Sequence, residues 1–179
     1  MTSEAVNRTQ CWLSEWVIDL NLCPFAKYPF QNNQVKIFST KETNADEIYR
    51  FVLSELDALY QSSVEEVETV LLVVENALDD FEDYLDFLML LEDVIDQIGL
   101  RGIIQVASFH PRYCFDGCAE NDAANYTNRS PYPMFHLLRE ESLEKALANY
   151  ENPEKIPERN IALLQEMGVE LIKQKLSKI

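Results

Sequence analysis

The feature that most constrains the fold is a set of three short apolar segments in the middle of the chain, separated by longer amphipathic ones. Residues 34–40 alternate polar and apolar side chains, which is typical of a half-buried strand. Residues 69–74 (TVLLVV) are apolar and rich in β-branched side chains, as in a central strand covered on both faces. Residues 103–109 (IIQVASF) have a similar character. We therefore expect three strands in this region.

Amphipathic helices are predicted in both gaps between these strands. Apolar side chains recur at steps of three and four over residues 45–60, and Thr43 or Asn44 is placed to cap the start. Residues 78–98 repeat the pattern with carboxylates opposite, and Gly99 is placed to end the helix. Such alternation with short links indicates right-handed crossovers in a parallel sheet. The predicted fold class is α/β, or α+β, with a three- to four-stranded, mainly parallel sheet covered by helices.

Further elements are expected on either side of this centre. Residues 4–20 have helical periodicity, and residues 21–33 form a loop restricted by two prolines. Residues 134–140 (MFHLLRE) alternate as a fourth strand. Three more helices are predicted over residues 142–150, 153–168 and 169–179. A chain of 179 residues can bury a self-supporting core, so we expect one domain over residues 1–179.

The charge of the chain bears on its partners. The formal net charge is −16, and residues 42–96 hold 17 acidic side chains against the single basic Arg50. No stripe of Lys and Arg exists to replace phosphate counterions, so we expect neither nucleic acid nor an anionic membrane as a partner. The acidic middle is interpreted as a solubilising outer face. The alternative is a docking surface for a basic partner.

The chain is expected to be soluble and cytoplasmic. Residues 1–7 are polar and lack the apolar core of a signal peptide, and no later run reaches the length of a membrane span. The four cysteines are scattered through the chain, which fits free thiols in a reducing compartment. No cofactor motif occurs, so no cofactor is expected. The oligomeric state does not follow from the sequence.

Residues 108–140 hold the densest group of chemically useful side chains. They contain both histidines, three of the seven prolines and two of the four cysteines. Their polar groups are costly to bury without partners, and their many aromatic residues argue against a disordered linker. Ordered connections of this length are usually functional. We therefore expect one long ordered loop, starting at His110, where the third strand ends and where ligands of open α/β sheets bind.

Four runs of residues carry a resemblance to a known family. They are residues 21–26 (NLCPFA), 105–111 (QVASFHP), 125–133 (NYTNRSPYP) and 136–140 (HLLRE). In these runs the chain resembles an uncharacterised bacterial family catalogued as domain of unknown function 1415. The resemblance spans nearly the whole chain, and its Asn-Arg-Ser-Pro-Tyr-Pro run is specific. It implies no reaction, cofactor or partner.

The leading hypothesis is a pocket for an anionic small molecule, a carboxylate or a phosphate. Guanidinium groups suit such anions because they form paired, charge-assisted hydrogen bonds with them. The ligand-binding residues predicted are Lys27, Asn125, Asn128, Arg129, Ser130, Tyr132, His136 and Arg139. The competing interpretation is that these polar groups tie the long loop to itself and to the body.

A catalytic version of this hypothesis uses His110 as general acid or base, because imidazole titrates nearest neutrality. Cys23 is the candidate nucleophile, although no orienting third residue or oxyanion-hole motif accompanies it, and its alternative role is a small buried hydrophobe. Whether the protein is an enzyme is left open. A metal site from His110, Cys114, Cys118 and His136 is disfavoured, because their spacing needs a helix that the local proline and glycine oppose. No metal is expected.

The alternative to any pocket is a non-enzymatic protein-interaction module. It would dock a partner through the acidic face of the helix at residues 78–98 or through the C-terminal helix. This alternative predicts no cavity between His110 and Arg129. The pocket hypotheses predict a concave opening into which polar side chains point.

Overall fold

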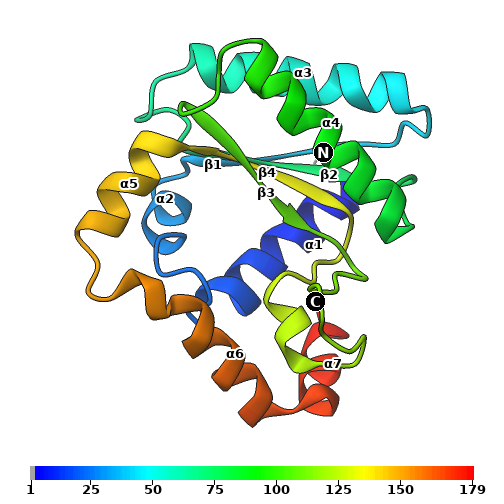
Figure 1. The fold of residues 1–179 in the computed structure, drawn as a ribbon, viewed down its shortest axis with the longest axis vertical. Helices are drawn as coiled ribbons and strands as arrows, with labels where there is room; N and C mark the ends of the chain where they lie inside the picture. The colour runs from blue at the N-terminus through cyan, green and yellow to red at the C-terminus, as the bar shows by residue number, and fades with distance from the viewer. Residues whose placement is uncertain (1–2) are drawn as a thin grey trace.

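The computed structural model describes residues 3–179, and its centre is a four-stranded sheet with helices on both faces (Figure 1). The strands, in the order β1-β2-β4-β3, are β1 (Val35–Thr40), β2 (Thr69–Val74), β4 (Met134–Arg139) and β3 (Ile104–Phe109). β1 and β2 pair in parallel, whereas β4 pairs antiparallel with both β2 and β3. The α/β class is confirmed. Three strands run in one direction, and β4 lies reversed between two of them.

One face of the sheet is covered by α3 (Ala45–Gln61) and α4 (Phe81–Gln97). The predicted cap of α3 is confirmed, since the Asn44 side chain accepts hydrogen bonds from the first backbone N–H groups of the helix. α4 begins at Phe81, three residues after the start expected from periodicity. The reason is local: Leu78 has a φ of 59°, outside the helical region, and Asp80 caps the helix instead.

Tyr84 joins α4 to the end of the sheet where β3 stops and β4 starts. Its side chain has no exposed surface, and its ring stacks on Phe135 with 5.0 Å between ring centres. The hydroxyl donates to the Met134 carbonyl (2.7 Å) and accepts from the Phe109 N–H (3.1 Å). Burial raises the pKa of Tyr84 far above its ordinary value, so the hydroxyl keeps its proton for this pair of bonds.

The opposite face is covered by α1 (Glu4–Trp12), which continues as a π-helical stretch, η1 (Leu13–Ile18). The helix expected at residues 4–20 is thus present, but its backbone hydrogen bonding changes from α-helical to π-helical at Leu13. Trp12 and Trp16 are buried, and their indole N–H groups donate to the carbonyls of Arg129 (3.2 Å) and Tyr126 (3.3 Å). These two bonds fasten the long loop to the N-terminal helix. The loop expected at residues 21–33 contains a short helix, α2 (Lys27–Gln31).

The remaining elements follow β4 and form a bracket at one side of the sheet (Figure 1). They are α5 (Glu140–Ala148), η3 (Pro153–Lys155), α6 (Ile156–Met167) and α7 (Val169–Leu176). The expected stop at Gly168 is confirmed: its φ of 74° ends α6 and lets α7 start in a new direction. The long segment between β3 and β4 contains a single short helix, η2 (Ala123–Thr127).

The contacts of Tyr84 generate a stability prediction. Tyr84→Phe keeps the ring and leaves the Met134 carbonyl and the Phe109 N–H without their shared partner, so we expect a loss of about 1 to 3 kcal/mol of unfolding free energy. Urea unfolding followed by circular dichroism measures it. Tyr60→Phe is the matched control, because Tyr60 is 47% exposed on α3 and should change stability by less than about 0.5 kcal/mol. Equal effects of the two substitutions would contradict the role given to the Tyr84 hydroxyl.

Candidate functional site

Asn125 holds the long segment between β3 and β4 together from inside. It has no exposed surface; its side-chain oxygen accepts a hydrogen bond from the Phe115 N–H (3.0 Å). Its amide nitrogen donates to the carbonyls of Ala119 (2.9 Å) and Glu120 (3.2 Å). A fully paired buried amide stabilises a loop that has few ladder hydrogen bonds of its own. The hydrogen-bonding groups of Asn125 are thus occupied within the segment.

His110 and Asn128 close the two ends of the same segment. His110 is fully buried; its Nε2–H donates to the Leu78 carbonyl (2.9 Å), and its Nδ1 accepts from the Arg112 N–H (3.0 Å). Burial, more than any neighbouring charge, lowers the pKa of His110 and favours this neutral ring. The Asn128 carbonyl accepts from the His110 N–H (3.2 Å), and its side chain donates to the Ser108 carbonyl (3.1 Å). Both ring nitrogens of His110 are therefore engaged by the backbone.

Arg129 lies on the outer side of this segment. Its guanidinium carbon is 4.5 Å from the centre of the Tyr126 ring, a cation–π contact. Nε donates to the Tyr113 carbonyl (3.0 Å) and Nη2 to the Glu120 carbonyl (2.8 Å). No carboxylate among residues 3–179 forms an ion pair with it. The side chain is thus held in position while its full charge lacks an acidic partner.

Arg129 and Ser130 line a cleft of about 270 Å³. Arg8 enters it from α1; its guanidinium carbon lies 5.9 Å from the centre of the Tyr132 ring, and no hydrogen bond or ion pair within residues 3–179 engages it. The Ser130 hydroxyl donates to the Tyr132 carbonyl (2.6 Å). The other lining residues are Pro111, Tyr126, Pro131, Leu176 and Ile179. Two guanidinium groups without acidic partners therefore share one concave surface.

Three of the cleft residues lie outside the segments that the sequence singled out. Arg8 is an exposed charge on an amphipathic helix, a pattern that any solvated helix face also has. Leu176 and Ile179 belong to the C-terminal segment, which reaches the cleft because α7 packs on the body through the fully buried Ile172. No local sequence pattern marks such a meeting of distant segments.

Two of the cationic residues that were predicted to bind the ligand lie away from the cleft. Arg139 donates to the carbonyls of Val67 (3.0 Å), Leu59 (2.7 Å) and Ser62 (2.8 Å), and so ties the end of β4 to the end of α3. These carbonyls at a helix C-terminus are natural acceptors for a cation. Lys27 is exposed at the start of α2. Neither side chain lines the cleft of Arg8 and Arg129.

Cys23 lies half-buried in the loop between η1 and α2. Burial raises the pKa of its thiol, and this effect is partly opposed by the backbone N–H groups of Phe25 and Ala26 and by the charge of Arg159. The protonated thiol is a weak nucleophile. The ring nitrogens of His110 bond to other groups, so the structure does not pair His110 with Cys23.

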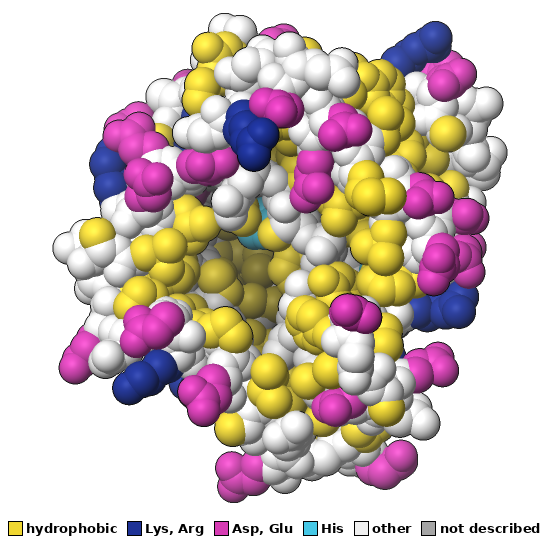
Figure 2. Space-filling model, viewed as in Figure 1, with side chains coloured by type: hydrophobic (Ala, Val, Ile, Leu, Met, Phe, Trp, Pro, Cys, Tyr) yellow, Lys and Arg dark blue, Asp and Glu magenta, His cyan; other side chains and the backbone are white. Residues whose placement is uncertain are grey.

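His136 is the histidine that reaches an opening. Figure 2 shows a hollow floored with hydrophobic side chains, with a histidine at its margin; this is His136, because His110 has no exposed surface. The His136 Nε2 lies 2.6 Å from the hydroxyl of Thr69, which in turn donates to the Leu137 carbonyl. Burial lowers the pKa of His136 to about 4, so the ring is neutral near neutral pH.

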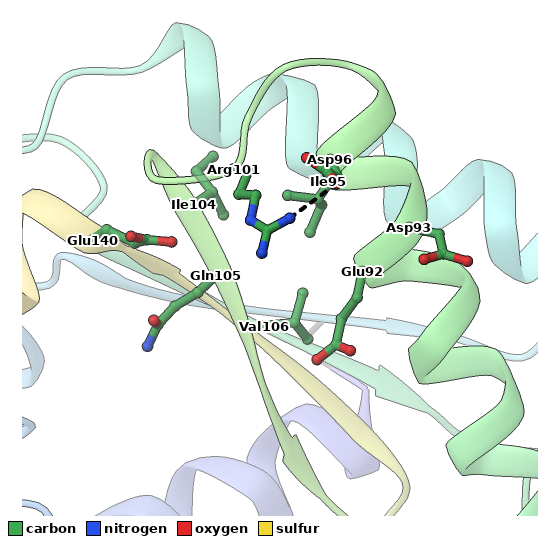
Figure 3. A pocket seen from close by; sticks show the side chains of 9 residues that line it. All are labelled: Glu92, Asp93, Ile95, Asp96, Arg101, Ile104, Gln105, Val106 and Glu140. Atoms are coloured by element: carbon green, nitrogen blue, oxygen red, sulfur yellow. Dashed lines mark hydrogen bonds and ion pairs between the residues drawn. The ribbon is translucent and has the colours of Figure 1, made fainter.

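A third concave surface lies between α4 and β3, on the other face of the sheet. It is a groove of about 440 Å³ into which side chains from both elements project (Figure 3). Its only cation is Arg101, which bonds to Asp96 at 3.1 Å. The carboxylates that line it are Glu92, Asp93, Asp96 and Glu140. This groove is therefore acidic, the opposite of the cleft at Arg129.

The comparison with known families agrees with the resemblance seen in the sequence. A family model described as a protein of unknown function, DUF1415, matches residues 4–174. The chain belongs to this family. No curated protein and no solved structure matches the chain. Within residues 3–179, no helix combines the length and the apolarity needed to cross a membrane.

The burial of the two histidines generates a pH prediction. The unfolded chain takes up these protons near pH 6.5, before the folded chain does, so their contribution to stability is complete above about pH 6.5 and is lost toward about pH 4 for His136. His136→Asn should remove on the order of 1 to 2 kcal/mol of the stability change between about pH 7 and about pH 5. Urea unfolding of both proteins across that range measures it. If the unfolding free energies of wild type and His136→Asn change equally with pH, His136 has the same pKa in the folded and the unfolded chain, and the prediction is wrong.

Proposed function

We propose that this protein binds a small anionic molecule, a carboxylate or a phosphate, in the cleft between α1, the long loop and α7. The observation that carries the proposal is the convergence of Arg8 and Arg129 on that cleft without an acidic partner for either among residues 3–179. Ten of the fifteen Lys and Arg side chains form no ion pair within residues 3–179, so the distinguishing feature is that two of them share one concave surface. A bound anion supplies the missing partner.

The geometry suits recognition by two guanidinium groups of different character. Arg129 is fixed by its bonds to two backbone carbonyls and by the Tyr126 ring, so little side-chain freedom is lost when an anion binds. Arg8 is exposed and has only the Tyr132 ring beneath it, so it can adjust to the ligand. Pro111, Pro131 and Leu176 provide apolar walls. The ligand expected is a compact anion with an apolar part.

The proposal is one of binding. No histidine, cysteine, aspartate or glutamate side chain lines the cleft, so no general base of these types stands beside the hydroxyls of Ser130 and Tyr126 there. The four cysteines are free, which supports a reducing, cytoplasmic location for such a binding protein. A small-molecule role also agrees with the acidic surface, which disfavours nucleic acid and anionic membranes.

Isothermal titration calorimetry with benzoate and with phenyl phosphate tests the proposal, because each probe joins a compact apolar ring to a carboxylate or a phosphate. Arg8→Gln should weaken binding of the better probe by about tenfold or more, because a charge-assisted hydrogen bond is lost while no hydrogen bond of the fold is touched. Arg101→Gln is the matched control, since Arg101 is exposed and lies in the acidic groove. Failure of wild type to bind either probe, or equal binding by wild type and Arg8→Gln, would refute an anion site here.

A second candidate function is docking of a basic, extended peptide in the groove between α4 and β3. β3 is an edge strand, so one side of its backbone has no strand partner within residues 3–179. Carboxylates from α4 lie beside this open edge (Figure 3). An added peptide strand could bond to the edge while its Lys or Arg side chains meet the carboxylates.

Fluorescence anisotropy with a short labelled peptide of alternating Lys and Val tests this second candidate. Glu92→Gln combined with Glu140→Gln should weaken binding by about threefold to tenfold, because each exposed ion pair contributes little alone. Asp46→Asn combined with Asp57→Asn, both exposed on α3, controls for the loss of two negative charges away from the groove. Equal weakening by the control would mean that only the net charge attracts the peptide.

A further inference from the structure

The hollow at His136 exists because one half of a sheet face is left incompletely covered. On the face that carries α1 and η1, the β2 residues Leu71 and Val73 are buried. His136 on β4 and its direct neighbour Ala107 on β3 point to the same side and remain partly exposed. The bracket from α5 to α6 borders this region without filling it, and the space-filling view shows the resulting cavity (Figures 1 and 2).

The chemistry of the hollow is apolar with one polar atom. Its floor consists of hydrophobic side chains, and the charged side chains lie outside it (Figure 2). The helix α5 on its border has an apolar stripe, formed by Leu143, Ala146 and Leu147, in which no residue is fully buried. Partly exposed apolar side chains on both the sheet and a bordering helix favour an apolar occupant.

His136 presents a lone pair to this space. The Thr69 hydroxyl donates its proton to the Leu137 carbonyl, so the His136 Nε2 must carry the hydrogen in its 2.6 Å bond to that hydroxyl. Nδ1 is then unprotonated. No group among residues 3–179 bonds to it, and it is not among the buried unpaired atoms, so it remains accessible. An accessible acceptor with no protein donor needs a donor from outside the chain.

We propose that the hollow is a second ligand site, which takes an uncharged small molecule whose apolar body fills the hollow and whose single hydroxyl or N–H group donates to Nδ1 of His136. A carboxylate or phosphate is disfavoured there, because its charge would face a lone pair without a cation. Neither His136 nor Ala107 lines the cleft of Arg8 and Arg129. The two sites can therefore be tested separately.

Equilibrium dialysis with 1-naphthol and 1-methoxynaphthalene tests the site at neutral pH. Both probes are uncharged and have the same aromatic body, but only 1-naphthol has a hydrogen-bond donor. Wild type should bind 1-naphthol at least about fivefold more tightly, because the methyl ether leaves Nδ1 covered and unpaired. Binding of neither probe, or equal binding of both, would overturn the proposal without recourse to any variant.

Substitutions then locate the binding. His136→Leu should abolish the preference for 1-naphthol while retaining 1-methoxynaphthalene, whereas His136→Asn, which keeps an acceptor near Nδ1, should restore part of it. Ala107→Phe should weaken both probes, because the new ring fills the hollow beside His136. Tyr60→Phe on α3, across the sheet, should change neither. If His136→Leu still prefers 1-naphthol, the hydroxyl of the probe donates to a group other than His136. That result would refute the proposed hydrogen bond to Nδ1.

Discussion

The structure depends on how the buried polar groups of the long segment between β3 and β4 find partners. This segment has little regular secondary structure, so its backbone groups are paired by side chains: Asn125 from inside, His110 and Asn128 at its ends, and Trp12 and Trp16 from the N-terminal helix. All of these side chains except the half-buried Asn128 are buried, and the loss of any one would leave another group unpaired. The segment is rigid for this reason, and its rigidity places the Arg129 guanidinium on one wall of a cleft. The interior hydrogen bonds of this segment thus stabilise it, while its surface presents the Arg129 guanidinium to the cleft.

Much of the fold follows from hydrophobic periodicity, but the place of β4 does not. A continuous apolar, β-branched run identifies the strand at residues 69–74, and alternation of side chains across the sheet identifies the strand at residues 134–140. A strand that returns after a long segment can join either edge or enter between two strands, and that choice rests on packing between distant residues. One indication was present in the sequence: Met134, Phe135 and Leu137 supply apolar side chains to both faces, as in a central strand. The start of α4 lies at Phe81 and not at Leu78, because Leu78 has a left-handed backbone conformation that hydrophobic periodicity does not reveal.

The polar residues of the candidate site show why sequence alone could not separate binding from structure. Asn125, Asn128 and Arg129 were singled out because buried polar groups need partners, and backbone carbonyls meet that need as well as a ligand does. The structure gives the partners of the two asparagines to the loop itself and leaves the charge of Arg129 without an acid. Arg139 likewise donates to a backbone carbonyl at the end of α3. Arg8 could not be singled out, because its role depends on the rotation of α1 and on the docking of α7.

The distribution of charge gives the three concave surfaces different selectivities. Electrostatic interactions between exposed charges are screened over roughly 8 Å at physiological salt, so each surface responds mainly to its own lining. The groove at α4 is lined by four carboxylates, while the cleft at Arg8 and Arg129 is lined by two guanidinium groups and by no Asp or Glu side chain. The hollow at His136 has a neutral ring and an apolar floor, so the binding proposed there would rest on burial of apolar surface and one hydrogen bond. A chain with a net charge of −16 can thus present concave surfaces of acidic, basic and neutral character.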